Sequence, residues 1–146
     1  MLFGKRKRIV KRILVVEDEP LVAFDNETML NDAGYTVVAT IDTFDGAIEL
    51  IDREKIDLIL SDVRLSGKRT GIDLAIAAKQ RGIPILFATG HQLPKEAAEH
   101  AIGCLNKPYS ERQLKNALKC VERHLGGGKI KPMKGLELYV GAASTD

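Results

Sequence analysis

The stretch IDLILSD, residues 56–62, is an apolar run of the kind that forms a buried strand, and it ends in the carboxylate of Asp62. An earlier run, RILVVEDEP, residues 12–20, ends in the same way at Glu17 and Asp18. In an open parallel sheet, ligands lie outside the carboxyl ends of the strands. The two runs therefore predict an α/β sheet with three acids gathered at one edge.

Two further runs bring a hydroxyl and an ammonium group to the same edge. IPILFATG, residues 83–90, reaches Thr89 near its end, and residues 102–106 lead into Lys107 and Pro108. Clustered carboxylates with a nearby cation and hydroxyl form a site for a divalent ion and a phosphoryl group. Mg²⁺ fits such a site, because it takes oxygen ligands and neutralises acids that would otherwise repel one another.

Helix-like segments separate the strand-like runs. Pro20 suits the first turn of one helix, Gly34 suits its end, and Ser110 suits the N-cap of the last helix. The expected strands are residues 12–17, 36–39, 57–61, 84–88 and 102–106, and the expected helices are residues 20–33, a segment after Thr43, residues 72–78, a short segment near 94–100 and residues 110–125. Five β–α units predict a doubly wound parallel sheet with helices on both faces.

Length and composition favour one domain with an extension at each end. The chain has 146 residues, of which 45% are hydrophobic, so it can bury a proper core. We expect a basic arm over residues 1–11, the domain over residues 12–125, and a Gly-rich linker and tail over residues 126–146. The tail fits either a disordered segment or an extra packed segment.

Charge and cysteine content narrow the class of protein. Residues 1–12 hold six of the 22 Lys and Arg residues and no acids, which leaves 16 basic against 20 acidic residues in the rest. The lack of interleaved aromatic residues favours a solvated arm over a nucleic-acid site. No apolar stretch approaches the roughly 18 residues of a membrane helix. Cys104 and Cys120 lack metal-ligand spacing and predict reduced thiols in a cytoplasmic protein.

The ordered set of site residues resembles the receiver domain of two-component response regulators over roughly residues 11–125. The matching residues are Glu17, Asp18, Asp62, Thr89, Lys107 and Pro108. The resemblance implies the flavodoxin-like strand order 2-1-3-4-5 and a phosphoryl group accepted by Asp62 from a histidine kinase. It implies that Mg²⁺ is bound by Glu17, Asp18, Asp62 and the backbone carbonyl of Arg64. Thr89 and Lys107 would contact the phosphoryl group, and the protein would catalyse only its own phosphorylation and dephosphorylation.

One position departs from the usual receiver pattern. Receivers usually carry Tyr or Phe three residues before the lysine, and its rotation reports phosphorylation, but this position is Cys104. Residues 87–90, FATG, resemble the signature of the "FAT GUY" receivers, an alphaproteobacterial subgroup that lacks this aromatic residue, although His91 and Gln92 depart from it. The subgroup implies a single-domain regulator that works with a histidine kinase of the HWE or second-dimerisation-domain type.

The remaining expectations concern two residues beside the site and a contact face on the surface. Arg64 and His91 each lie two residues beyond a site residue, and they either tune the lifetime of the acyl phosphate or are plain exposed side chains. We expect no output domain after the last helix. Output is then either protein contact, at a face formed by Leu93, Ala97 and Ala101 with the adjoining strand 102–106 and last helix, or withdrawal of phosphoryl groups from a kinase.

An enzyme is the alternative interpretation. A phosphatase or phosphotransferase of the haloacid dehalogenase-like kind also forms an aspartyl phosphate, on a small substrate. Such enzymes typically carry Asp-x-Asp on the first strand, whereas Asp62-Val63-Arg64 places an arginine at the third position and lies on the third strand. The receiver interpretation is therefore favoured.

Overall fold

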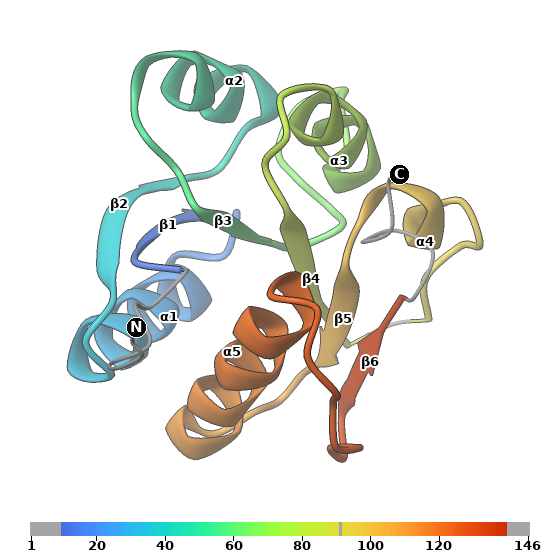
Figure 1. Cartoon of the computed structure of the whole chain (residues 1–146). Helices are drawn as coiled ribbons and strands as arrows, with labels where there is room; N and C mark the ends of the chain where they lie inside the picture. The colour runs from blue at the N-terminus through green and yellow to red at the C-terminus, as the bar shows by residue number, and fades with distance from the viewer. Residues whose placement is uncertain (1–9, 91, 140–146) are drawn as a thin grey trace.

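A six-stranded sheet forms the centre of the molecule (Figure 1). The structure, a computed structural model, describes residues 10–90 and 92–139. The elements are β1 (Arg12–Val16), α1 (Pro20–Asp32), β2 (Thr36–Ile41), α2 (Phe44–Arg53), β3 (Leu58–Ser61), α3 (Gly71–Gln80), β4 (Ile85–Thr89), α4 (Ala97–His100), β5 (Gly103–Asn106), α5 (Glu111–Leu125) and β6 (Leu136–Leu138). The strand order β2-β1-β3-β4-β5-β6 confirms the predicted parallel order 2-1-3-4-5 and adds an antiparallel strand at one edge.

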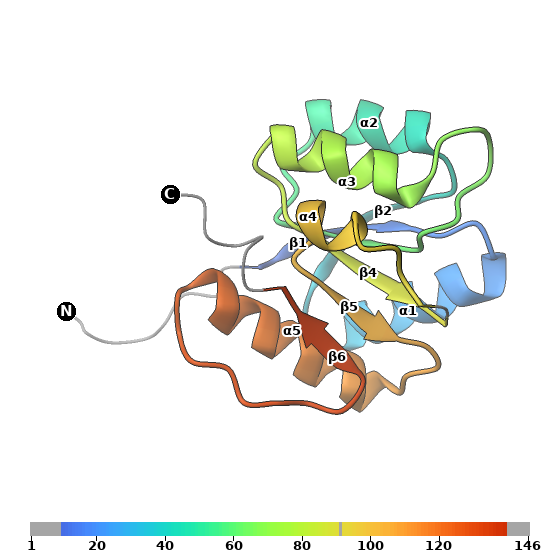
Figure 2. The same cartoon turned by 90° about the vertical axis from the view of Figure 1, so that its right-hand side faces the viewer.

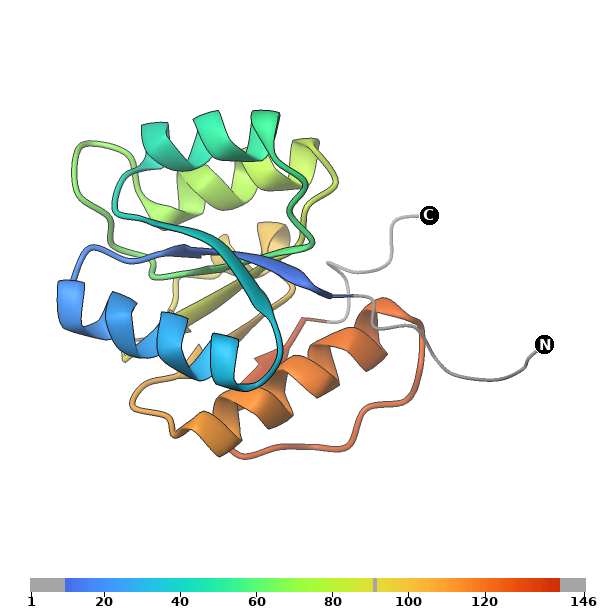
Figure 3. The ribbon, with the colours of Figure 1, turned by 90° about the vertical axis from the view of Figure 1, so that its left-hand side faces the viewer.

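Helices cover both faces of the sheet, as the strand composition requires. Figure 3 shows α1 and α5 on one face and α2 and α3 on the other. Alternate residues of β1 serve the two layers: Leu14 and Val16 belong to the core under α2 and α3, and Ile13 and Val15 belong to the core under α1 and α5. Because successive strand side chains point to opposite faces, one short apolar run supplies both cores.

Side-chain caps fix where α2, α3 and α5 begin, and therefore where the preceding loops end. The Thr43 hydroxyl accepts a hydrogen bond from the Gly46 amide at the start of α2. Thr70 with Asp73, at α3, and Ser110 with Gln113, at α5, form reciprocal capping boxes. Each box satisfies backbone amides that have no partner within the helix. The box at Thr70 starts α3 one residue earlier than the sequence predicted.

The predicted contact face around α4 is wrong for two of its three residues. Ala97 and Ala101 are both 0% exposed and belong to the core under α2 and α3. Their small side chains let this four-residue helix lie close to the sheet, so they pack inward. Leu93 is half-buried. A partner that approaches this region would meet other residues, among them the exposed Glu96 and Glu99.

The described part of the tail packs as an extra strand. β6 pairs antiparallel with β5 in the register Gly103↔Leu138, Cys104↔Glu137 and Leu105↔Leu136. Figure 2 shows β6 beside β5, below α4 in that view. Gly103 makes the pairing possible, because a Cβ atom at this position would collide with the carbonyl oxygen of Glu137. Of the two alternatives for the tail, residues 136–138 follow the packed one.

The start of the described chain is packed as well. Val10 is buried, and its amide donates to Oε2 of Glu122 at 3.2 Å. The amides of Lys11 and Arg12 both donate to Oδ2 of Asp57 at 2.9 Å. Most of the predicted basic arm, residues 1–9, lies outside the described residues. Among the described helices, none has the length and apolar character needed to cross a bilayer.

Candidate functional site

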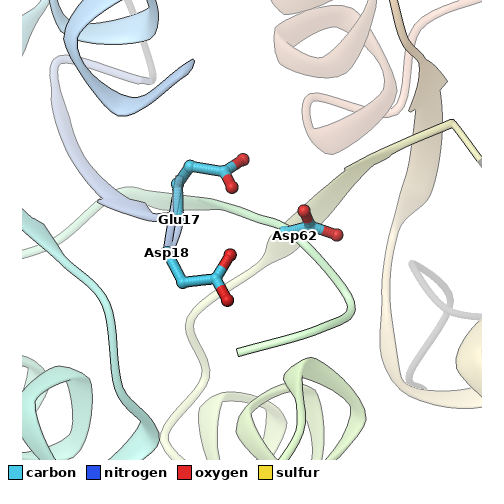
Figure 4. Close-up of side chains that lie close together, drawn as sticks. All are labelled: Glu17, Asp18 and Asp62. Carbon is cyan, nitrogen blue, oxygen red and sulfur yellow. The ribbon is translucent and has the colours of Figure 1, made fainter. Parts of the chain in front are cut away.

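Three carboxylates meet at the carboxyl ends of β1 and β3, as the sequence predicted. Glu17 and Asp18 follow β1, Asp62 follows β3, and these two strands are hydrogen-bonded neighbours. One carboxylate oxygen from each of the three residues lies within 4.8 Å of the other two. Figure 4 shows the side chains of Glu17 and Asp18 directed toward the side of the sheet where Asp62 lies. Although Glu17 and Asp18 are adjacent, the turn after β1 lets both approach one point.

Lys107 is the cation of this cluster. Its Nζ donates to Oε1 of Glu17 at 2.8 Å and to Oδ2 of Asp62 at 3.1 Å. The side chain of Glu17 is 2% exposed, that of Asp62 is 15% exposed and that of Lys107 is 20% exposed. Two partly buried anions therefore share one ammonium group, and Lys107 lies in a cis peptide with Pro108.

The pKa shifts follow from this shared contact. Burial raises the pKa of Glu17 above its ordinary value, and the charge of Asp62 adds to the rise, while Lys107 offsets only part of it. Burial alone would lower the pKa of Lys107, but its contacts with the two carboxylates raise it overall. Lys107 is therefore firmly protonated. The ionised form of Glu17 is destabilised by its burial and by the nearby charge of Asp62.

Backbone amides hold the second oxygen of Asp62. Its Oδ1 accepts from the amide of Val63 at 2.6 Å and from the amide of Arg64 at 3.3 Å. The start of α3 lies directly behind this turn: the Gly71 amide donates to the Val63 carbonyl at 2.7 Å. A Cβ atom at Gly71 would collide with the carbonyl oxygen of Asp62. The close approach of α3 thus supports the turn that presents the carboxylate, a role that the sequence analysis missed.

Thr89 is buried at the end of β4, the strand next to β3. Its carbonyl accepts a hydrogen bond from the Lys107 amide at 2.9 Å, and Thr89 pairs in register with Asn106 of β5. The hydroxyl-bearing and ammonium-bearing residues are therefore joined through the backbone. The predicted set of Glu17, Asp18, Asp62, Thr89 and Lys107 comes from the same edge of the sheet.

Asn26 and Tyr109 form a second link across the site. The Tyr109 hydroxyl donates to Oδ1 of Asn26 in α1 at 2.7 Å, and Asn26 is buried. Burial raises the pKa of Tyr109, and the charges of Glu17 and Asp62 contribute to the rise. The bond holds the loop that carries Lys107 against the helix that follows Glu17. A polar residue at helical spacing from Ala23 and Leu30, both buried, was the sequence signal for this link.

The other singled-out residues lie around the site in different ways. Arg64 is exposed, two residues beyond Asp62, and His91 lies outside the described residues. Cys104 is buried on the sheet face that carries α4, where burial raises its pKa to about 11. The thiol is therefore protonated near neutral pH. Cys120 is half-buried, and neither cysteine is in a disulfide.

The donor set fits a hard divalent cation. Oxygen atoms of three carboxylates converge within 4.8 Å, and no thiol or imidazole is among them. Mg²⁺ prefers such ligands and retains several waters, so a few protein oxygens at an open edge suffice. Lys107 supplies one positive charge for three acids, so within the described residues its contacts leave the cluster short of counter-charge.

Comparison with known proteins shows a match to one protein family. Residues 13–119 match the family described as the response regulator receiver domain. The chain is 34% identical over 116 residues to the transcriptional regulatory protein PdtaR of Mycobacterium tuberculosis (strain H37Rv), a match that covers 76% of this chain and 56% of PdtaR. It is 32% identical over 81 residues to the phyllosphere-induced regulator PhyR of Methylorubrum extorquens, covering 54% of this chain and 30% of PhyR.

Solved structures agree with these sequence matches. The N-terminal domain of a response regulator/sensory box/GGDEF 3-domain protein from Carboxydothermus hydrogenoformans superposes with a TM-score of 0.72 at 30% identity. That match covers 80% of this chain and 98% of the other. By contrast, the chain spans only about half the length of PdtaR. The similarity to PdtaR therefore concerns part of that protein.

Proposed function

This chain belongs to the response regulator receiver domain family of two-component signalling, and we propose that it accepts a phosphoryl group on Asp62 from a histidine kinase. The contact of Lys107 with both Glu17 and Asp62 is the observation that carries this proposal. A carboxylate that is presented by backbone amides and faces a fixed ammonium group is placed to attack phosphorus and to have the resulting charge balanced.

The proposed roles follow from where each residue lies. Asp62 is the nucleophile, and Lys107 contacts an equatorial phosphoryl oxygen after leaving Asp62. Thr89 donates its hydroxyl to another oxygen, and the amides of Val63 and Arg64 already point at the acceptor carboxylate. Glu17, Asp18 and Asp62, with the backbone carbonyl of Arg64, would hold Mg²⁺. Bound Mg²⁺ supplies charge neutralisation for the transferring phosphoryl group.

An exposed apolar pair on α1 supports docking of a kinase beside the acceptor. Leu21 is 81% exposed and Phe24 is 66% exposed, and both lie in the first turns of the helix that follows Glu17 and Asp18. Two large apolar side chains exposed beside the acceptor offer apolar area that a partner could bury. A donor histidine that reaches Asp62 must approach this edge, so the pair lies where a helical kinase surface would rest.

The finer assignment rests on the resemblance of residues 87–90 and on the PhyR match. We infer a receiver of the FAT GUY kind, in the cytoplasm, with a kinase of the HWE or related type as phosphodonor. Cys104 has no ring to rotate, which supports an output other than the usual aromatic switch. Either a protein partner binds one phosphorylation state of Asp62 in preference to the other, or the domain withdraws phosphoryl groups from the kinase.

Labelling by a small phosphodonor tests the acceptor assignment directly. We expect acetyl phosphate with Mg²⁺ to label the wild-type chain with an acid-stable, base-labile phosphoryl group, and we expect Asp62→Asn to abolish labelling. Asp32→Asn, at an exposed acid near the end of α1, is the matched control and should label like the wild type. Undiminished labelling of Asp62→Asn would refute the assignment.

A further inference from the structure

The extra strand β6 lies against the same structural unit that carries Thr89 and Lys107. β5 leads directly into Lys107, and β6 is paired with β5 by backbone hydrogen bonds at both ends. The Asn106 amide donates to the Gly135 carbonyl at 2.7 Å, and the Tyr139 amide donates to the Ile102 carbonyl at 2.9 Å. β6 therefore links the described part of the tail to β5, the strand that leads into Lys107.

A cavity of about 540 Å³ connects the phosphoryl site with this strand. Thr89 and Lys107 line it on the site side, and Glu137 and Tyr139 line it on the side of β6. Phe87 and Cys104 are paired in register. Because strand residues alternate between faces, Thr89, Cys104, Glu137 and Tyr139 all belong to the face of the sheet that carries α4. Two groups that a phosphoryl group would recruit thus share a hollow with Glu137 and Tyr139.

Tyr139 is incompletely seated in this hollow. Its side chain packs against the core under α2 and α3, together with Leu93, but remains half-buried. Burial raises its pKa to about 12, so the hydroxyl stays neutral and carries no charge into the cavity near neutral pH. The cavity beside it offers room for a ring to move further in. Such a ring would gain apolar contact if polar neighbours withdrew.

β6 has the features of a strand that opens easily. It has three residues, of which Glu137 is exposed and Leu136 and Leu138 are half-buried. Segments with little buried apolar surface open locally at a small fraction of the global unfolding free energy. An edge strand that opens also uncovers the backbone groups of the strand beneath it, here β5. The state of β6 therefore decides whether the edge of β5 is covered.

We propose that β6 responds to the state of Asp62: when a phosphoryl group on Asp62 draws Thr89 toward it, Tyr139 settles deeper into the cavity and β6 is held more tightly on β5. The proposal rests on the proposed function. In this response the moving aromatic residue is Tyr139 of the tail. The position that usually carries the aromatic residue in receivers is Cys104 here. The coupling is reciprocal, so tighter docking of β6 must also strengthen binding of a phosphoryl group at Asp62.

Amide hydrogen exchange of the full chain tests the proposal, with beryllofluoride and Mg²⁺ as the probe of the occupied site. We expect the Tyr139 amide and the Asn106 amide to exchange about 5-fold more slowly or better with the probe than with Mg²⁺ alone, the lower end of usual coupling strengths. Unchanged protection at both amides would overturn the coupling, and faster exchange would overturn its direction.

Matched variants measure the reciprocal effect. Tyr139→Ala should weaken beryllofluoride binding several-fold, whereas Tyr139→Phe, which keeps the ring, should bind like the wild type. Equal affinities for all three proteins would refute the role of the ring. Asp62→Asn separates the two proposals. If fluorine spectra show the probe bound to wild type and not to this variant, the acceptor assignment stands even where the β6 result is negative. If the probe binds neither or both, the acceptor assignment itself fails.

Discussion

Replacing Lys107 with methionine should reveal how much the single cation stabilises the acidic cluster. Methionine keeps an unbranched apolar stem of similar reach but removes the ammonium group that contacts Glu17 and Asp62. The variant therefore buries the 2%-exposed side chain of Glu17 without its ion-pair partner. Unpaired burial of this kind is the costly case for a charged group.

The magnitude can be estimated from the two contact distances. At an effective dielectric constant of about 20, contacts of 2.8 Å and 3.1 Å each represent about 5–6 kcal/mol of gross attraction. Desolvation of the ammonium group offsets much of this, and breaking a fully buried pair typically costs about 3–5 kcal/mol. Because the Lys107 side chain is 20% exposed, we reduce that figure to about 2–3 kcal/mol near pH 8 without metal.

The loss should depend on pH in a defined direction. The pKa of Glu17 is raised above its ordinary 4.5, so its ionisation costs more in the folded state, and stability falls as the pH rises through the raised value. Removing Lys107 removes the contacts that hold this pKa down, so the loss extends to higher pH. The pKa of Lys107 is itself raised above 10.5, so the wild-type lysine stays charged throughout. The variant should thus be closest to wild type near pH 5.

Urea denaturation at pH 5 and pH 8, with and without Mg²⁺, measures the effect. Added Mg²⁺ should reduce the deficit at pH 8, because the variant lacks the competing ammonium group, binds the cation more tightly and is therefore stabilised more than the wild type. Lys119→Met, on the exposed side of α5, is the control and should change stability by less than about 0.5 kcal/mol. An equal deficit at both pH values would show that lost packing, and not the unpaired carboxylate, causes the instability.

Three further predictions concern neighbours of the acids. Tyr109→Phe leaves the buried Oδ1 of Asn26 without its donor, so urea denaturation should show a loss of about 1–3 kcal/mol, and labelling by acetyl phosphate should slow. Gly71→Ala pushes a Cβ atom into the carbonyl of Asp62 and should cost about 1–3 kcal/mol and weaken Mg²⁺ binding measured by calorimetry. Phe24→Ser, at an exposed position, should leave stability within about 0.5 kcal/mol and acetyl phosphate labelling unchanged while slowing transfer from the kinase. Full stability of Tyr109→Phe, undisturbed Mg²⁺ binding by Gly71→Ala, or normal kinase transfer to Phe24→Ser would each contradict its prediction.

Local sequence predicted the sheet and its acidic edge because both depend on short-range patterns. β1, β3 and β4 are largely apolar runs, and a functional side chain comes at the end of each: Glu17 follows β1, Asp62 follows β3, and Thr89 is the last residue of β4. Parallel pairing then brings those ends together without any further specification. The meeting of Asp62 with Glu17 and Asp18 follows from that topology alone.

Contacts between distant segments were not predictable from such patterns. Ala97 and Ala101 lie in a segment too short for helical periodicity to assign a buried face, and both are packed inward. β6 has only three residues, too few for alternation to distinguish a strand from a loop. Its pairing depends on Gly103, which lies more than thirty residues earlier and leaves room for the backbone of Glu137. Such complementarity exists only between folded surfaces.

The ion pairs of Lys107 and the Tyr109–Asn26 hydrogen bond respond differently when the ammonium group moves from Asp62 to a phosphoryl oxygen. The ion pair to Glu17 and Asp62 involves only Nζ, at the end of a flexible stem, whereas the Tyr109 hydroxyl and the Lys107 amide are held by Asn26 and by the Thr89 carbonyl. The ammonium group can therefore turn toward a phosphoryl oxygen while its loop remains fixed. Thr89 has a single side-chain torsion, so its hydroxyl reaches only a short way unless the end of β4 moves with it. A phosphoryl group that attracts this hydroxyl therefore also displaces the end of β4. Because β4 is hydrogen-bonded to β5, and β5 to β6, the displacement can reach β6.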